Sequence, residues 1–160
     1  MRLIFVIIFY SIALAGVSQS SQNLKFEKSK GHWPFPVKSF SKYTVSPDNK
    51  LDRCQVGSTG ITFFVDKVDS VKAVYEGKVI AVFSLIDGFA ILTKFGDYFI
   101  AYSNVDNPTV KKDDYIFQGQ YIGSIPTGAD QLFVALYFKE SKEINPYPWF
   151  SWPKEILSQD

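Results

Sequence analysis

The chain has 160 residues, of which 46% are hydrophobic and 17% aromatic, so it can bury the core of one globular domain and is neither collagen-like nor largely disordered. Lys and Arg total 17 against 16 Asp and Glu, a balance that argues against a protein that binds nucleic acid by neutralising phosphates. With a single cysteine, Cys54, and a single histidine, His32, the chain cannot form an internal disulfide or a multi-histidine metal site.

Residues 1–15 have the pattern of a secretory signal peptide. Met1 and Arg2 precede an apolar run that is shorter than the roughly 20 residues a membrane-spanning helix needs. Ala13 and Ala15 offer small side chains where a signal peptidase reads them, and cleavage is expected after Ala15. An uncleaved N-terminal anchor is the alternative. The sequence therefore predicts a secreted protein, periplasmic or extracellular, with no membrane span after cleavage.

The residues after the predicted signal divide into a leader, a domain and a tail. Residues 16–30 are rich in Ser, Gln and Lys without apolar periodicity, which predicts a flexible leader. Residues 31–153 contain short apolar segments rich in Val, Ile, Phe and Tyr, separated by Gly, Asp or Pro, a pattern typical of antiparallel β-structure. Residues 154–160 are assigned to a tail. We expect an all-β or mainly β domain with little helix.

The turn residues predict particular strands. Asp87-Gly88 separates two apolar runs and favours a tight hairpin turn. Gly96-Asp97 predicts a second turn, which would make the following segment the next strand of a meander. A short helix is expected only after Pro148. The expected strands are residues 79–86, 89–94, 98–102, 120–125 and 131–138.

Aromatic side chains are expected mainly in the core, where they bury a large apolar area. Tyr98 and Tyr102 are the exceptions, because a phenol hydroxyl suits the wall of a hydrated cleft. The glycines are spaced as turn and bulge residues, and no nucleotide-binding fingerprint is present.

Four stretches in order resemble the LytM-type domain of the lysostaphin-like zinc metallopeptidases, enzymes that cut peptide cross-links in peptidoglycan. The resemblance covers residues 31–152 and implies an antiparallel LytM-type β-sandwich or open barrel with a groove. It is similar in particular to the degenerate branch typified by EnvC-type murein hydrolase activators. The stretches are residues 31–37 (GHWPFPV), 71–79 (VKAVYEGKV), 96–105 (GDYFIAYSNV) and 110–123 (VKKDDYIFQGQYIG), and residues 144–149 (INPYPW) resemble the segment that closes these domains.

The resemblance also implies a zinc site, and here the sequence departs from the family. The family's His-x-x-x-Asp motif falls on Ser58 and Thr62, and its His-x-His motif falls on Gln131 and Phe133. Asn104 stands where the family has a further active-site histidine. Zinc needs about three ligands of the imidazole, thiolate or carboxylate type, so we expect the family zinc to be lost, no other cofactor and no catalytic residue.

Other chemistries lack support in the sequence. Ser58 and Cys54 have no histidine at a position that would make it a base. Asp113 and Asp114 are read as acids of a solvated turn rather than as a glycosidase pair. Residues 110–123 also resemble half of a lipoyl-type hairpin domain, but those carrier domains are much shorter than this chain.

The sequence thus predicts a secreted pseudoenzyme whose groove binds peptidoglycan peptides or a cell-wall amidase or division protein, as a regulator of envelope remodelling. The degenerate groove would be lined by Ser58, Thr62, Asn104, Gln131 and Phe133. An active metalloendopeptidase of the same family is one alternative. A purely structural or interaction module is the other.

Overall fold

The computed structural model describes residues 18–46, 59–128, 130–139 and 141–153. The predicted signal peptide and the predicted tail lie outside these residues. Antiparallel β-strands are the main regular structure of the described chain, which confirms the fold class expected from the alternation of short apolar segments and turn residues. No helix among the described residues is long and apolar enough to cross a membrane.

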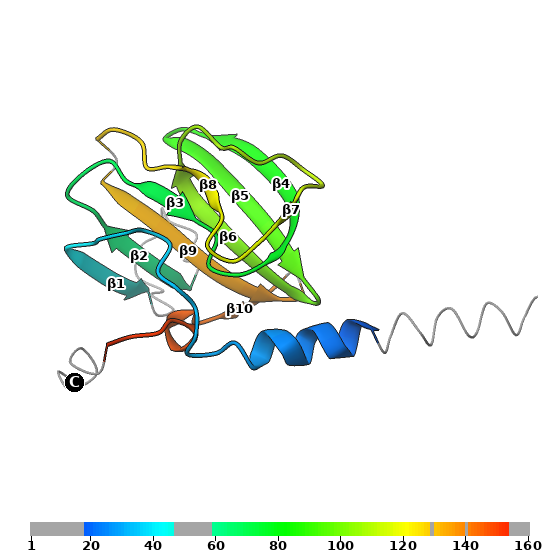
Figure 1. The fold of residues 1–160 in the computed structure, drawn as a ribbon. Helices are drawn as coiled ribbons and strands as arrows, with labels where there is room; N and C mark the ends of the chain where they lie inside the picture. The colour runs from blue at the N-terminus through cyan, green and yellow to red at the C-terminus, as the bar shows by residue number, and fades with distance from the viewer. Residues whose placement is uncertain (1–17, 47–58, 129, 140, 154–160) are drawn as a thin grey trace, which may run out of the picture.

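In the described part of the chain, ten strands form one large sheet and one small ribbon (Figure 1). The large sheet has the order β1-β2-β9-β6-β5-β4-β7, and β10 pairs with β9. Strands β3 and β8 form the separate two-stranded ribbon. The strands are β1 (Lys42–Ser46), β2 (Gly60–Phe64), β3 (Ser70–Lys72), β4 (Gly77–Leu85), β5 (Gly88–Phe95), β6 (Tyr98–Val105), β7 (Tyr115–Ile116), β8 (Tyr121–Ser124), β9 (Gln131–Phe138) and β10 (Lys142–Ile144), followed by the 3-10 helix η1 (Tyr147–Trp149).

The two predicted turns join β4, β5 and β6 into a meander. Gly96-Asp97 connects β5 to β6 as expected, and Gly96 adopts a positive φ of 60°. The β4–β5 turn is Ile86-Asp87, one residue earlier than the predicted Asp87-Gly88, because Gly88 already pairs with Leu85. Gly88 is the first residue of β5 and has a φ of 118°, a backbone conformation that residues with a side chain disfavour.

Within the segment expected to be a flexible leader, the described residues 18–30 contain a helix, which differs from the sequence prediction. Residues 18–27 are helical, and the helix packs beside the β5–β6 turn (Figure 1). Phe26 is fully buried and stacks on Tyr98, with 4.1 Å between ring centroids. Asn23 donates from Nδ2 to Asp97 Oδ2 at 2.8 Å and accepts from the Asp97 backbone N–H at 2.8 Å. The helix is held by one buried aromatic side chain and a few polar hydrogen bonds. Such contacts leave no apolar periodicity in the sequence, so the helix was not predicted.

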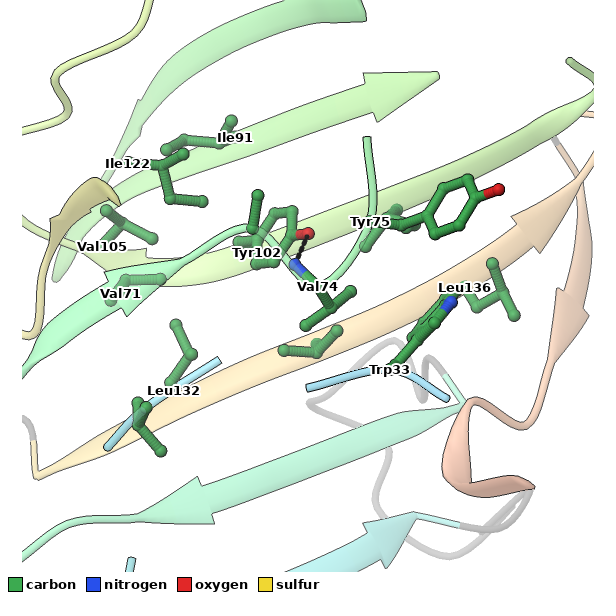
Figure 2. Close-up of a cluster of buried hydrophobic side chains, with 14 of the residues drawn as sticks. Trp33, Val71, Val74, Tyr75, Ile91, Tyr102, Val105, Ile122, Leu132 and Leu136 are labelled. Atoms are coloured by element: carbon green, nitrogen blue, oxygen red, sulfur yellow. Dashed lines mark hydrogen bonds between the residues drawn. The ribbon is translucent and has the colours of Figure 1, made fainter. Parts of the chain in front are cut away.

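The core lies between the inner face of the large sheet and the β3–β8 ribbon (Figure 2). Val71 and Ile122 from the ribbon face Ile91 and Tyr102 from the sheet, and all four are fully buried. At the centre, the Val74 backbone N–H donates to Tyr102 Oη at 2.9 Å. The opposite face of the sheet carries partly exposed side chains on strands β2, β9 and β6.

Candidate functional site

The open face of the sheet carries two of the predicted groove residues next to each other. Along β2 and β9, side chains alternate between the buried core and the other face, as a pleated strand requires. Thr62 on β2 lies directly opposite Phe133 on β9, and Phe133 lies directly opposite Ser103 on β6. Directly opposite residues share a face of the sheet, so these three partly exposed side chains form one row across it.

Gly60 makes room for the Phe133 ring. A Cβ atom at position 60 would meet the Phe133 ring and would stand 2.7 Å from the Val134 carbonyl oxygen. The ring therefore lies over the backbone of β2. The next row of the same face holds Gly60, Ala135 and Ala101, which are small. Phe133 thus stands above a floor of small residues and is only partly buried rather than part of the core.

Asn104 is placed by a β-bulge in β6. Phe89 pairs with Val105 and Ala90 pairs with Ser103, so Asn104 is the extra residue between the two pairs. Its φ is 66°, a left-handed conformation that asparagine tolerates better than most side chains. A bulge turns a side chain away from the regular alternation of the strand. The backbone therefore orients Asn104 toward the end of the sheet.

Asn104 and Gln131 line one pocket of about 510 Å³ at that end of the sheet. Their amides offer both hydrogen-bond donors and acceptors. Thr127 adds a hydroxyl group, and Asp87, in the β4–β5 turn, is the one charged side chain among the described lining residues. Such a lining suits hydrogen bonding to a peptide or another polar ligand. The described residues that line the pocket are Asp87, Asn104, Pro126, Thr127, Gly128 and Gln131.

Gln131 connects this pocket to the row on the open face. It lies two residues before Phe133 on β9, so both side chains point to the same side of the sheet. Gln131 pairs with Phe64 of β2, whereas Phe133 pairs with Thr62. Four of the five predicted groove positions are therefore brought together. The fifth, Ser58, lies outside the described residues.

The two tyrosines expected in the groove wall lie in the interior instead. Tyr102 is fully buried, and burial raises its pKa above the ordinary value for tyrosine. Its hydroxyl accepts the Val74 N–H, so the polar group serves the core. Tyr98 is 6% exposed and donates to Glu27 Oε1 at 2.7 Å. Burial, followed by this hydrogen bond, raises the pKa of Tyr98.

Sequence reasoning did not find the part of the pocket formed by Asp87, Pro126 and Thr127. Asp87 was read only as a turn residue, and residues 126–128 carry no chemical motif. The only available signal was that each of these loops joins two expected strands. The β4–β5 turn and the loop before β9 lie at the same end of the sheet, so their residues meet there.

The side chains present do not fit the zinc ion that the resemblance implies. The four described groove positions hold a hydroxyl group, two amides and a phenyl ring, whereas zinc sites use imidazole, thiolate and carboxylate ligands. In the part of the chain that the structure describes, no three His, Cys, Asp or Glu side chains cluster in a way that could hold a metal ion. Asp87 contributes one carboxylate to the pocket, too few for such a site.

Comparison with protein families gives one match. The model for peptidase family M23 matches residues 56–146, a range that includes all five predicted groove positions. No curated protein matches the chain.

Several solved structures have a similar fold. Csd3 from Helicobacter pylori gives a TM-score of 0.62 at 16% identity, covering 76% of this chain and 33% of that chain. A chain of the pore-forming SpoIIQ–SpoIIIAH complex gives 0.57 at 14% identity, covering 79% and 96%. The antimicrobial peptidase lysostaphin from Staphylococcus simulans gives 0.50 at 26% identity, covering 57% and 42%. The chain spans about a third of Csd3 and under half of lysostaphin.

Proposed function

Because this chain belongs to peptidase family M23, and because its groove positions hold neutral side chains, we propose that it is a secreted member of the family that binds without catalysing. The groove would take peptidoglycan peptides or a cell-wall hydrolase, and the protein would act as a regulator or activator in envelope remodelling or division. The family fold supplies the groove. The changed side chains remove the metal chemistry.

The observation that carries this proposal is the pairing of Asn104 and Gln131 in one pocket. In the enzymes that this sequence resembles, the corresponding positions hold histidines that lie beside a zinc-bound water. Here two primary amides replace them, and an amide is a good partner for peptide N–H and C=O groups but a poor metal ligand. The pocket is thus suited to recognition of a polar backbone.

A second feature supports a binding role over a purely structural one. Phe133 is partly exposed on the open face, although an apolar ring at a merely structural position would be expected in the core. Thr62 and Ser103 flank it with hydroxyl groups. An aromatic ring between hydrogen-bonding side chains can pack against a ligand while its neighbours fix the ligand's orientation.

Similar structures favour an envelope setting and a protein partner. One of them is a chain from the SpoIIQ–SpoIIIAH complex, in which two proteins assemble into a pore-forming unit. Lysostaphin is an antimicrobial peptidase. The partner of the present chain is proposed to be either peptidoglycan or a wall hydrolase, and the experiment below distinguishes the two.

The test measures co-sedimentation of the purified protein with insoluble peptidoglycan and, separately, the rate of a cell-wall amidase with and without the protein. Asn104→Gly is the informative variant, because glycine keeps the positive φ of 66° while removing the amide. Asn107→Gly is the matched control: Asn107 also has a positive φ, 45°, but its side chain bonds to Asp106 and it does not line the pocket.

Binding or activation that is lost in Asn104→Gly and kept in Asn107→Gly supports the proposal. Loss of co-sedimentation identifies peptidoglycan as the partner, whereas loss of amidase activation identifies the hydrolase. Equal results for both variants would contradict a role for the pocket. Cleavage of peptidoglycan by the protein alone would contradict the loss of catalysis.

A further inference from the structure

Strand β4 has an unusually exposed outer edge. Its inner edge pairs with β5 from Lys78 to Leu85. On the outer side, β7 pairs only with Gly77 and Lys78, and Val79 bonds to the backbone of residues 113 and 114. Beyond Val79, within the described chain, no backbone hydrogen bond covers residues 80–85 on that side. Figure 1 shows β4 at the margin of the sheet, beyond β5.

This edge also lacks the usual protection against pairing. Exposed edge strands generally carry charged residues or proline, which discourage a second strand from adding. Residues 79–86 (VIAVFSLI) contain neither. By contrast, β1 begins at Lys42, and β10 carries Lys142 and Glu143. Residues 80–85 of β4 therefore form a stretch of sheet edge with neither charge nor proline to protect it.

Apolar side chains along the same stretch are exposed to solvent. Phe83 is 49% exposed, Leu85 40% and Ile86 fully exposed. Phe83 lies opposite Ala90 on β5, and Ala90 lies opposite Ser103 on β6, so Phe83 extends the row that contains Phe133. The uncovered edge and the exposed apolar side chains thus coincide in one strand, next to the candidate groove.

We propose that residues 80–85 of β4 pair antiparallel with the same residues of a second copy of this chain, joining the two sheets edge to edge. This inference is independent of the proposed binding function. Backbone N–H and C=O groups of each strand would satisfy those of the other, as in β-strand addition. A twofold axis perpendicular to the sheet relates the copies, so both open faces lie on the same side of the joined sheet.

The strand is complementary to itself in size and charge. With Phe83 opposite Phe83 of the second copy, Ala81 lies opposite Leu85, so a small side chain meets a large one on the open face. On the other face, Val82 lies opposite Ser84. No like charges oppose each other, because residues 80–85 contain no charged side chain. The contact uses up the free β4 edge of both copies, which closes the assembly at two.

The expected association is reversible, because six residues of edge pairing bury less area than a standard protein interface. Sedimentation velocity of the purified protein over a range of concentrations is expected to show a monomer–dimer equilibrium. Phe83→Lys and Phe83→Glu place like charges directly opposite each other and are each expected to weaken the dimer at least about tenfold. Phe117→Lys, at an aromatic position that is 64% exposed, is the matched control and should leave the dimer unchanged.

An equimolar mixture of Phe83→Lys and Phe83→Glu provides the sharpest test, because it places opposite charges at the centre of the pairing. Recovery of the dimer in the mixture, but in neither variant alone, supports this register. Protein that stays monomeric up to about 1 mM would overturn the proposal and leave the edge to a strand from another protein. A dimer that is insensitive to both Phe83 variants, or a mixture that fails to recover, would overturn the β4 pairing described here.

Discussion

Replacing Tyr102 by phenylalanine removes one oxygen atom from the centre of the core. The Tyr102 hydroxyl is the acceptor for the Val74 N–H at 2.9 Å, and both residues are fully buried. Without it, a buried backbone donor loses its partner, which costs about 1–3 kcal/mol. The ring itself stays in place, so no large cavity opens. We therefore expect Tyr102→Phe to lower the free energy of unfolding by about 1–3 kcal/mol.

The assay is urea unfolding of the wild-type and variant proteins, followed by tryptophan fluorescence. The transition midpoint should fall while the slope with denaturant stays constant, because the area exposed on unfolding is unchanged. Tyr121→Phe is the control, since Tyr121 is 44% exposed and should change stability by less than about 0.5 kcal/mol. A Tyr102→Phe protein as stable as wild type would refute the account of this hydrogen bond.

Four further predictions concern pH, the core and the candidate site. Burial raises the pKa of Tyr102, so the folded state keeps a proton that the unfolded state releases above pH about 10. The stability that this proton contributes is full below that pH and falls above it. Urea midpoints measured from pH 8 to about 12 should therefore decline less in Tyr102→Phe than in the wild-type protein. Phe26→Ala should lower the free energy of unfolding by about 3–5 kcal/mol in urea, whereas stability near wild type would show that the helix is not anchored by Phe26. Phe133→Ala should reduce co-sedimentation with peptidoglycan, or amidase activation, more than it reduces the urea midpoint, and an equal loss in both would make Phe133 a core residue. Gly60→Ala should destabilise by about 1–3 kcal/mol, because its methyl group meets the Val134 carbonyl, and thermal unfolding measures this directly.

The strands were predictable because their signals are local. Gly96-Asp97 marks its own turn whatever the rest of the chain does, and the short apolar run in residues 131–138 matches β9. The Asp87-Gly88 turn was placed one residue late, because Gly88 pairs with Leu85 and the turn is made by the two residues before it. The position of the turn depends on the register between β4 and β5, which short-range sequence patterns do not determine.

The N-terminal helix and the tyrosine positions depended on long-range contacts. Phe26 is buried among rings that come from distant segments, including Tyr75 and Trp33. A helix with one buried anchor has no apolar period for sequence analysis to detect. Likewise, the hydroxyl group of Tyr102 indicated a hydrated site, but its partner, Val74, is 28 residues away in the sequence and fully buried.

Candidate site residues were predictable where a family motif supplied their positions. Thr62, Asn104, Gln131 and Phe133 follow from such positions, and the structure gathers them on one face and in one pocket. Asp87 belongs to no motif and enters the pocket only because a hairpin turn lies beside the loop before β9. A residue that joins a site through folding alone leaves no signal in a single sequence.

We propose that this chain keeps the fold of peptidase family M23 without its metal chemistry. The most direct test is the release of soluble fragments from purified peptidoglycan by the protein in the presence of added zinc, with active lysostaphin as a positive control on a susceptible substrate. We predict release no greater than that in buffer alone. Zinc-dependent release by the purified protein, abolished by a chelator, would contradict the account.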